Sequence, residues 1–432
     1  MGGILGKKGG TFLLRTVRKD DFYDAKKPVL LLGVNSLTPL ERPLNDIQRT
    51  AKGINASIAI VEQRYTGESL PTKEFSVETL RKFFTVPQSV QDVALVGQNI
   101  KSRLPGIRII LFGCSNGGTI AALARKYYQD VFDGAIVSSA PLKFQLEMPE
   151  DEHVVLSISF IPSVKYTEVV AKDFSNPALG GSRQCLTALE DAHSAIGKKL
   201  GSPEGRRQLE KTLDIHEMDL ETREVQSVLT FNGVLTGIDL QSNDPLCEEE
   251  YCNIQKICKK FTEGGATPLD MLATIYKASK PRRDLAAGLK VLLAELKDEK
   301  NPGEYRMSDF HSCSSRGLLS TCDSAACPFF TRIGNTWVDY LTWLCQEGFG
   351  ISKADILKGV EELRKYVDDF RSTSNILSIN GDADPWYPSS ISKEGEGPEV
   401  ELVRGAPHCY WCDVYDETVS ERIRNVIKKW LR

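Results

Sequence analysis

The sequence predicts an α/β protein in which a parallel β-sheet is interrupted by a large helical insertion. Apolar runs at 28–33, 57–65, 107–112 and 134–141 are continuous, rich in β-branched residues and bounded by turn-forming residues. Such runs are typical of strands that are buried on both faces of a parallel sheet. Helical patterns separate them, and this alternation stops after Pro141 and resumes at 374–380. We therefore expect one α/β unit that an insertion divides into two parts.

The helices that should cover this sheet have their own patterns. The segment 89–104 spaces Val90, Val93 and Ile100 along one helical face, and the segment 119–128 follows a strand and a glycine-rich turn. Between about 150 and 335 the patterns are mainly helical. A last strand begins at 399, and the closing helix 417–432 has one apolar side, made of Val419, Ile423, Val426, Ile427 and Trp430. The expected domains are 1–149 and 336–432 for the α/β unit and 150–335 for a helical cap.

The composition excludes several classes of function. The chain has 432 residues, a formal net charge of −4, 41% hydrophobic and 26% charged residues, which is ordinary for a globular protein. It has no stripe of Lys and Arg, so we expect no nucleic-acid partner. No apolar run approaches the roughly 20 residues that a membrane-spanning helix needs, and the first residues lack the apolar core of a signal peptide.

Eleven cysteines are unusually many, and most of them are clustered along the chain. The pair Cys409 and Cys412 has the spacing of metal ligands, but no second pair completes a zinc site. Disulfides are the preferred interpretation, and they indicate an oxidising compartment. An odd number leaves at least one thiol unpaired, and we expect this thiol to be Cys114.

The most informative motif is Gly113-Cys114-Ser115-Asn116-Gly117, which stands between an expected strand and an expected helix. Gly-x-Ser-x-Gly in this context is the nucleophile elbow of α/β-hydrolases, in which the serine side chain is exposed on a strained turn. The glycines leave room for the strand and the helix that meet there. An ordinary strand-to-helix turn that contains a serine is the alternative.

The order of residues along the chain favours a catalytic serine. In α/β-hydrolases an acid and then a histidine follow the serine. Of the five histidines, His408 alone lies after the last expected strand, and the others fall in the expected insertion, where a solvated or core histidine is the default. Asp382 and Asp384 both follow the strand at 374–380, and either can be the acid or a turn former.

The chain resembles a family of serine peptidases that includes prolyl carboxypeptidase, dipeptidyl peptidase II and thymus-specific serine protease. The blocks "TFLLR", "VEQRYTGESLP", "GCSNGG", "GAIVSSAPL", "YTEVVAKDF", "WLCQEGFG", "NGDADPW" and "GAPHC" occur in the family's order, from Thr11 nearly to the C-terminus. Two letters differ from the family's GGSYGG, because Cys114 and Asn116 replace a glycine and a tyrosine.

The resemblance implies a fold, a reaction and a catalytic triad. The fold would be that of an α/β-hydrolase with a mostly helical, cysteine-bearing insertion. Ser115 would be the nucleophile, Asp384 rather than Asp382 the acid, and His408 the base. Asn116 would supply one oxyanion donor through its backbone N–H, and the loop after the first strand, near Gly33 to Asn35, would supply a second.

The resemblance also implies cleavage next to proline near a peptide terminus, either as a carboxypeptidase or as a dipeptidyl peptidase. Trp386 is the candidate wall of a proline pocket, and Trp411 is a weaker candidate that core packing would equally explain. Glu347 could meet a substrate α-amino group, although a solvated helix charge is the simpler interpretation. Proline-containing peptides are the expected substrates, without a metal or cofactor, and a homodimer stays open.

Two other functions compete with an exopeptidase. The elbow alone also fits a lipase or esterase, and the altered elbow fits a binding protein that kept the fold without activity. By resemblance the protein is lysosomal or secreted, and Asn55-Ala56-Ser57 is a glycosylation sequon that adjoins an expected buried strand.

Overall fold

The computed structural model describes residues 2–5, 11–21, 24, 26, 28–36, 45–147, 166–231, 243–279, 284–300, 303–319, 327–331 and 337–432. Its largest element is a seven-stranded sheet with the strand order β11-β10-β7-β6-β4-β5-β3. All neighbouring strands are parallel except β3 and β5. The strands are β3 (Thr16–Lys19), β4 (Val29–Val34), β5 (Ser57–Val61), β6 (Arg108–Cys114), β7 (Gly134–Ser138), β10 (Ile376–Gly381) and β11 (Glu399–Val403).

Helices cover both faces of this sheet, as the buried apolar strands require. Successive residues of β4 point to opposite faces, so that Leu30 and Leu32 belong to one core cluster and Leu31 to the other. α3 (Val86–Arg103) and α4 (Asn116–Tyr127) lie on the first face. α1 (Asn45–Ile54), the short α15 (Tyr410–Asp413) and α16 (Glu417–Trp430) lie on the second. α16 buries the apolar side that the sequence predicts.

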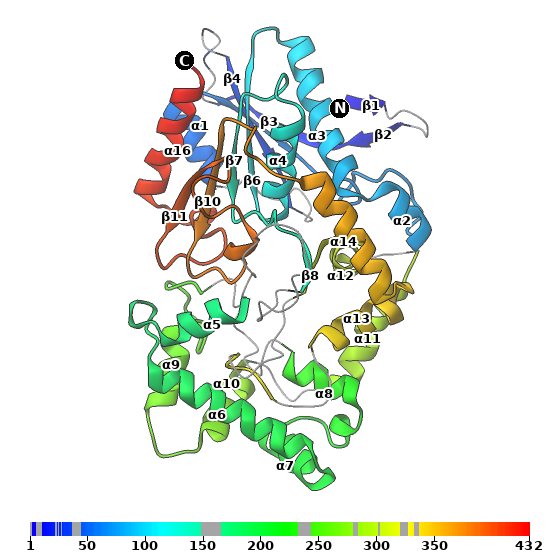
Figure 1. The fold of residues 1–432 in the computed structure, drawn as a ribbon, viewed down its shortest axis with the longest axis vertical. Helices are drawn as coiled ribbons and strands as arrows, with labels where there is room; N and C mark the ends of the chain where they lie inside the picture. The colour runs from blue at the N-terminus through cyan, green and yellow to red at the C-terminus, as the bar shows by residue number, and fades with distance from the viewer. Residues whose placement is uncertain are drawn as a thin grey trace.

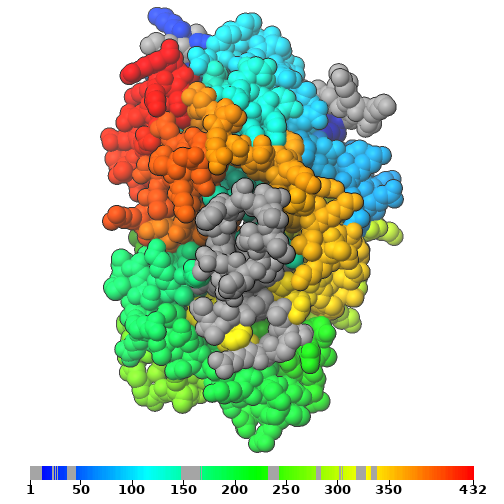
Figure 2. All heavy atoms as spheres, in the orientation of Figure 1, coloured from blue at the N-terminus to red at the C-terminus, as the bar shows by residue number. Residues whose placement is uncertain are grey.

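The segment between β7 and β10 is mainly helical and forms the other half of the molecule (Figure 1). In Figure 2 its green and yellow residues lie below the blue, cyan and orange-red residues of the sheet half. Its helices are α5 (Tyr166–Ser175), α6 (Arg183–Leu200), α7 (Pro203–Leu213), α8 (Arg223–Thr230), α9 (Ile254–Thr262), α10 (Pro268–Ser279), α11 (Leu285–Lys297), α12 (Glu304–His311), α13 (Trp337–Phe349) and α14 (Lys353–Val367). Because α13 packs against α11, the helical half continues beyond residue 335. The expected domain limits stay predictions.

Smaller elements complete the chain. β1 (Gly2–Leu5) and β2 (Thr11–Leu14) form an antiparallel pair, and α2 (Val77–Phe83) precedes α3. β8 (Gln145–Glu147) pairs in parallel with β9 (Gly317–Leu319), which follows a short π-helical turn, η3 (Ser312–Arg316). Of the helices that the structure describes, none is long and apolar enough to cross a membrane.

Disulfides support the helical half, as the cysteine clusters predict. Among the described residues, this half contains the pairs Cys185–Cys258, Cys247–Cys252 and Cys313–Cys345. They join segments that are separated by 73, 5 and 32 residues. The disulfide interpretation of the cysteine content is therefore confirmed.

Candidate active site

Ser115 stands alone between the last residue of β6 and the first residue of α4. Its backbone has φ 53° and ψ −123°, a conformation that costs free energy in a non-glycine residue. The Ser115 N–H donates to the carbonyl oxygen of Ser138 at the end of β7, at 2.8 Å, and the Ser115 carbonyl accepts from Thr119 N–H at 3.0 Å. These bonds hold the strained turn, which has the geometry of a nucleophile elbow.

The glycines around Ser115 are required by close approach of the backbone. A Cβ atom at Gly117 would collide with the carbonyl oxygen of Val34, and a Cβ atom at Gly113 would collide with the backbone of Gly117. No flexible side-chain end is available to move away in either case. The sequence expectation that glycines permit the strand and helix to meet is thus explained atom by atom.

Asp384 and Asp382 have different roles in the loop that follows β10. The fully buried Asp384 carboxylate lies 2.7 Å from His408 through Oδ2 and Nδ1, and its Oδ1 accepts from Trp386 N–H at 2.9 Å. Asp382 instead accepts from the Gly405 N–H at 2.5 Å and orders the loop that leads to His408. Of the two aspartates, Asp384 therefore contacts the imidazole, while Asp382 contacts the backbone of the loop.

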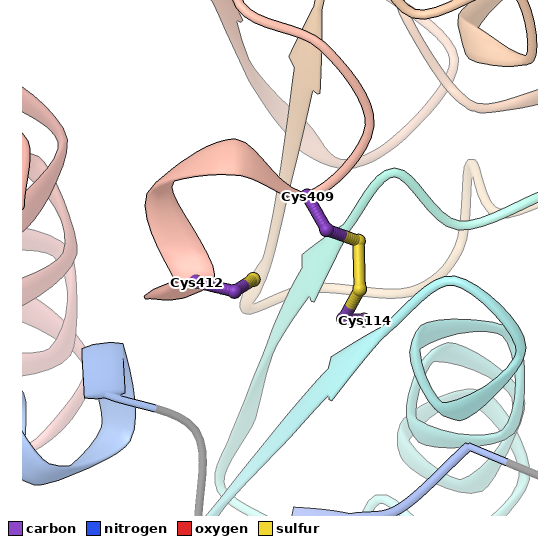
Figure 3. Close-up of side chains that lie close together, drawn as sticks. All are labelled: Cys114, Cys409 and Cys412. Carbon is purple, nitrogen blue, oxygen red and sulfur yellow. A yellow bond between two sulfur atoms is a disulfide. The ribbon is translucent and has the colours of Figure 1, made fainter. Parts of the chain in front are cut away.

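A disulfide ties the elbow to the histidine loop. Cys114 and Cys409 are bonded, with their Cα atoms 6.2 Å apart (Figure 3). Cys114 directly precedes Ser115, and Cys409 directly follows His408. The bond therefore brings the expected nucleophile and the expected base, 293 positions apart by their residue numbers (408 − 115), to the same point of the molecule.

This bond corrects one expectation from the sequence. We expected Cys114 to be the unpaired thiol, but it is oxidised, and the free cysteine among the described residues is the buried Cys412. The physical reason is proximity: once Ser115 and His408 meet, the cysteines beside them are within bonding distance. The spacing of Cys409 and Cys412 alone does not reveal this partner.

The environment of Cys412 keeps its thiol protonated. Burial, reinforced by the nearby Asp46 carboxyl, raises its pKa well above the usual value, and the thiol bonds with Ser138 and Asp46. The three sulfur atoms of Cys114, Cys409 and Cys412 lie within 4.8 Å of one another (Figure 3). Two of these sulfurs are bonded to each other, so the cluster does not offer three thiolates to a metal ion.

The end of β7 fixes both loops. Ser138 accepts the Ser115 N–H through its carbonyl oxygen and the Trp411 indole N–H through its hydroxyl, at 2.8 and 3.0 Å. The neighbouring Ser139 hydroxyl accepts the Cys409 N–H at 3.1 Å. The elbow and the histidine loop therefore rest on two consecutive residues of the same strand end.

The expected oxyanion donors lie in different surroundings. Asn116 is the first residue of α4, where backbone N–H groups have no partner within the helix. Gly33 lies inside β4, paired with β5 and β6, and Asn35 N–H donates to Val61 at 3.0 Å. The Ser36 hydroxyl donates to the Cys114 carbonyl at 3.0 Å and accepts from Gly117 N–H at 3.4 Å. In the loop after β4, it is therefore Ser36, and not Gly33, that contacts the elbow.

Arg316 is a residue of this site that the sequence pattern did not indicate. Its guanidinium donates to the side-chain oxygen of Asn116, directly beside Ser115. Burial lowers its pKa to about 10, its Nε has no partner, and no acidic side chain of the described residues pairs with it. A buried guanidinium without a carboxylate is costly, so it indicates an anion-binding position.

The three residues that we expected to bind substrate lie in different surroundings. Trp386 is half-buried beside Asp384, and its ring meets the edge of Tyr166 from α5 at 5.1 Å. Trp411 is 1% exposed and belongs to the core that α16 covers. Glu347 is exposed on α13 and pairs with Lys297 at 3.4 Å, which makes it a solvated helix charge. The burial of Trp411 and the ion pair of Glu347 favour the alternatives of core packing and a solvated helix charge, and the substrate-binding roles stay predictions.

None of the other histidines in the described part of the chain bonds to Ser115, Asp384 or His408. His193 is buried and bonds to the Leu189 carbonyl at 2.8 Å, and burial lowers its pKa to about 4. His311 is buried against Phe84, and His216 is exposed. His153 lies outside the described residues. Asn55, in the sequon, is exposed on the loop before β5.

The parallel sheet, with Ser115 on a strained turn between β6 and α4, defines an α/β-hydrolase fold. Residues 6–427 match the family model described as Serine carboxypeptidase S28. The chain therefore belongs to this family of serine peptidases, and the lipase or esterase alternative is not favoured.

Known proteins that are similar to this chain include proteases and carboxypeptidases. Thymus-specific serine protease of Mus musculus is 24% identical over 375 residues, which cover 82% of this chain and 69% of that protein. Lysosomal Pro-X carboxypeptidase of Bos taurus is 22% identical over 375 residues, with coverages of 83% and 70%. Among solved structures, proline iminopeptidase of Mycobacterium smegmatis is 12% identical with a TM-score of 0.40, and the match covers 100% of this chain and 97% of that chain.

Proposed function

We propose that this protein is a serine exopeptidase that cleaves peptides after proline, with Ser115 as nucleophile, His408 as base and Asp384 as the acid that orients the base. The observation that carries the proposal is the 2.7 Å bond between Asp384 and His408 in a loop that is disulfide-bonded to the elbow of Ser115. Membership of the peptidase family supports the same chemistry.

The proposed mechanism is acyl transfer in two steps. His408 accepts the Ser115 hydroxyl proton through Nε2, because its Nδ1 side is held by Asp384. The serine oxygen attacks the carbonyl carbon of the proline residue, and His408 then gives the proton to the departing amine. A water molecule, deprotonated by His408, hydrolyses the acyl-enzyme and releases the shortened peptide.

The oxyanion of each tetrahedral intermediate would lie between two backbone donors. Asn116 supplies the first from the N-terminus of α4, where the helix dipole also favours negative charge. We assign the second to Ser36, whose backbone N–H has no partner among the described residues and whose hydroxyl holds the loop against the elbow. Gly33 is less suitable, because the ladder of β4 uses its backbone.

Trp386 is the proposed wall of the proline pocket. The backbone N–H of Trp386 bonds to Asp384, which places the residue beside the proposed triad. Tyr166 of α5 packs against the Trp386 ring. A proline ring is flat and apolar and has no N–H to satisfy when it follows another residue. The aromatic pair of Trp386, from the loop after β10, and Tyr166, from the helical half, is suited to pack against a proline ring.

Arg316 favours release of the C-terminal residue over release of an N-terminal dipeptide. A carboxypeptidase must bind the α-carboxylate one residue beyond the scissile bond, and Arg316 offers a largely buried guanidinium beside Asn116. A dipeptidyl peptidase must bind an α-ammonium group. Asp173 of α5 lies near Asp384, but burial raises its pKa to about 8, so it is neutral at pH 7.

We also propose that the protein works in a lysosomal or extracellular compartment. Relatives include a lysosomal Pro-X carboxypeptidase and a probable extracellular serine carboxypeptidase of Arthroderma benhamiae. The disulfides of both halves are consistent with an oxidising environment. A homodimer and a glycan on Asn55 stay predictions.

Product analysis tests the proposed function. A peptide with proline at its second and its penultimate position is incubated with the protein, and the products are identified by mass spectrometry. We expect loss of the C-terminal residue. Release of the N-terminal dipeptide would contradict the assigned direction, and turnover of p-nitrophenyl esters alone would contradict the peptidase.

Substitution of Arg316 tests the direction separately. Arg316→Gln should raise KM for the free-acid peptide at least 10-fold, because a charged hydrogen bond to the carboxylate is lost, and Arg316→Lys should recover part of this loss. The exposed Arg371→Gln serves as the control. Equal KM values in Arg316→Gln and in the control would show that Arg316 does not bind the carboxylate.

A further inference from the structure

The disulfide Cys114–Cys409 lies at the position where it can control catalysis. It joins the residue before the expected nucleophile to the residue after the expected base. Both cysteines are partly exposed, whereas Cys412 beside them is buried. The other disulfides of the described residues connect segments of the helical half, and none of them includes a neighbour of Ser115, Asp384 or His408.

The histidine loop is held on two sides, and His408 lies between them. On the acid side, Gly405 N–H bonds to Asp382, and Ala383 N–H bonds to the Ala406 carbonyl at 3.3 Å. On the nucleophile side, the disulfide is the covalent attachment. These attachments hold the chain on both sides of His408, whose Nδ1 bonds to Asp384.

Without the disulfide, the loop would be held on the nucleophile side by packing and by hydrogen bonds, two of which reach the hydroxyl groups at the end of β7. These are Cys409 N–H to the Ser139 hydroxyl and the Trp411 indole to the Ser138 hydroxyl. Neutral hydrogen bonds contribute about 0.5–1.5 kcal/mol each, so the loop would remain folded but would be held less tightly. Cys409 also has a positive φ of 54°, which the loop must maintain.

We propose that the Cys114–Cys409 disulfide is a positioning element of the catalytic centre, which holds His408 against Ser115 and makes turnover depend on the oxidised state of this cysteine pair. The proposal rests on the proposed function of Ser115 and His408. Proton transfer requires the imidazole to lie within hydrogen-bond reach of the serine oxygen. A misplacement of about 1 Å can lower the rate about 100-fold.

Cys412 does not act as a resolving thiol for this bond. It is three residues beyond Cys409 and its sulfur lies close to the disulfide, but it is buried and bonded to Asp46 and Ser138. Exchange requires a thiolate, and a protonated, buried thiol attacks slowly. Loss of the bond therefore needs an external reductant.

The redox step is a two-electron reduction by a dithiol. The dithiol thiolate attacks one sulfur of Cys114–Cys409, and its second thiol then closes a cyclic disulfide. The protein gains two electrons and two protons and ends with two thiols, and the dithiol is oxidised. Reoxidation reverses both changes and restores the bond.

The test compares oxidised, reduced and substituted protein. Dithiothreitol should lower kcat about 10- to 100-fold while KM changes less than about twofold, and reoxidation should restore kcat. Cys114→Ala/Cys409→Ala should show the same low kcat without further sensitivity to the reductant. Cys247→Ser/Cys252→Ser removes a disulfide from the helical half and should keep the wild-type kcat.

Several outcomes would overturn the proposal. Wild-type kcat in the folded Cys114→Ala/Cys409→Ala protein would do so, and so would an equal response of that variant and the wild type to dithiothreitol. If the variant does not fold, the reversible change in kcat of the wild type decides, with disulfides mapped by mass spectrometry after reoxidation.

A readout without turnover separates this proposal from the proposed function. In protein labelled with ¹⁵N-histidine, the Nδ1–H signal of His408, assigned with His408→Ala, should be sharp when oxidised and broadened when reduced. If the signal broadens on reduction but the protein cleaves no peptide, the positioning role of the disulfide is supported and the proposed peptidase function is contradicted. An unchanged signal would contradict the positioning role.

Discussion

At the scale of single residues, two aspartates two positions apart contribute differently. Asp384 is fully buried and bonds to His408, whereas Asp382 bonds to the backbone N–H of Gly405. Asp384→Asn should lower kcat about 10³- to 10⁴-fold with little change in KM, because an amide N–H facing Nδ1 favours the wrong imidazole tautomer.

Asp382→Asn is the matched control for this prediction. An asparagine oxygen can still accept the Gly405 N–H, so kcat should stay within about 10-fold of the wild type. Steady-state kinetics with a proline-containing peptide measures both variants. A larger loss for Asp382→Asn than for Asp384→Asn would assign the acid to the other residue.

The sequence predicted Ser115, Asp384 and His408 through a motif, their order and a family resemblance, but it did not predict their surroundings. Cys114 was wrongly expected to be unpaired, although its place beside Ser115 and that of Cys409 beside His408 contained the signal. Two residues that flank members of one triad must be close in space. Pairing the flanking positions would have found this bond.

The depth of a side chain and its long-range partners could not be read from the sequence. An aromatic residue near His408 can face substrate or core, and only the packing around Trp411 shows that it is buried. Arg316 was missed because it belongs to η3, 200 positions from Asn116, and no motif marks it. Long-range contacts of this kind are not encoded in local periodicity.

At the scale of elements, the turn from β6 to α4 leaves no space for side chains at its glycines. Gly117→Ala should abolish measurable turnover and lower the melting temperature, because the added Cβ would overlap the Val34 carbonyl oxygen. Gly288→Ala is the control, since no atom lies within 4 Å of its added Cβ on α11, and it should be neutral or stabilising. Wild-type activity of Gly117→Ala would contradict the packing described for the elbow.

Strand positions were predictable, but strand ends were not. The apolar run 57–65 corresponds to β5, which stops at Val61. Beyond it Glu62 accepts from the Ser69 hydroxyl at 2.7 Å, and Arg64 donates to both Asp92 oxygens at 2.7 Å, so the chain turns into a buried polar loop. These partners lie elsewhere in the chain, and the hydrophobic pattern does not reveal them.

At the scale of the whole molecule, buried carboxyl groups make stability depend on pH. Burial raises the pKa of Asp46 to about 7 and that of Asp173 to about 8, from 3.8 in the unfolded chain. The folded protein therefore keeps protons on these two carboxyl groups that the unfolded chain releases. As a result, the free energy of unfolding falls as the pH rises through 7 to 8. Buried His193, with its pKa lowered to about 4, acts in the opposite direction, but only below about pH 6.5.

The free energy of unfolding should consequently fall between pH 6.5 and 8.5, on the order of 2 kcal/mol. Urea unfolding at a series of pH values measures it. Asp173→Asn should flatten the dependence near pH 8, and the exposed Asp191→Asn should leave it unchanged. A stability that increases over this range would contradict the protonated state of the two carboxyls.

The arrangement of the two halves was predicted only in outline. The sequence indicated an α/β unit with a cysteine-bearing helical insertion, and the seven-stranded sheet and the helices between β7 and β10 confirm this fold class. It did not indicate that α13 joins the helical half or that β8 and β9 pair where the halves meet. Such contacts depend on the packing of segments that are far apart in sequence.

Labelling by a fluorophosphonate, followed by peptide mapping, tests the central claim most directly, because this probe reacts with an activated serine hydroxyl. We expect stoichiometric modification of Ser115 in the folded wild type and little modification in His408→Ala, which lacks the base. No labelling of Ser115 in folded, oxidised protein, or equal labelling in His408→Ala, would contradict it.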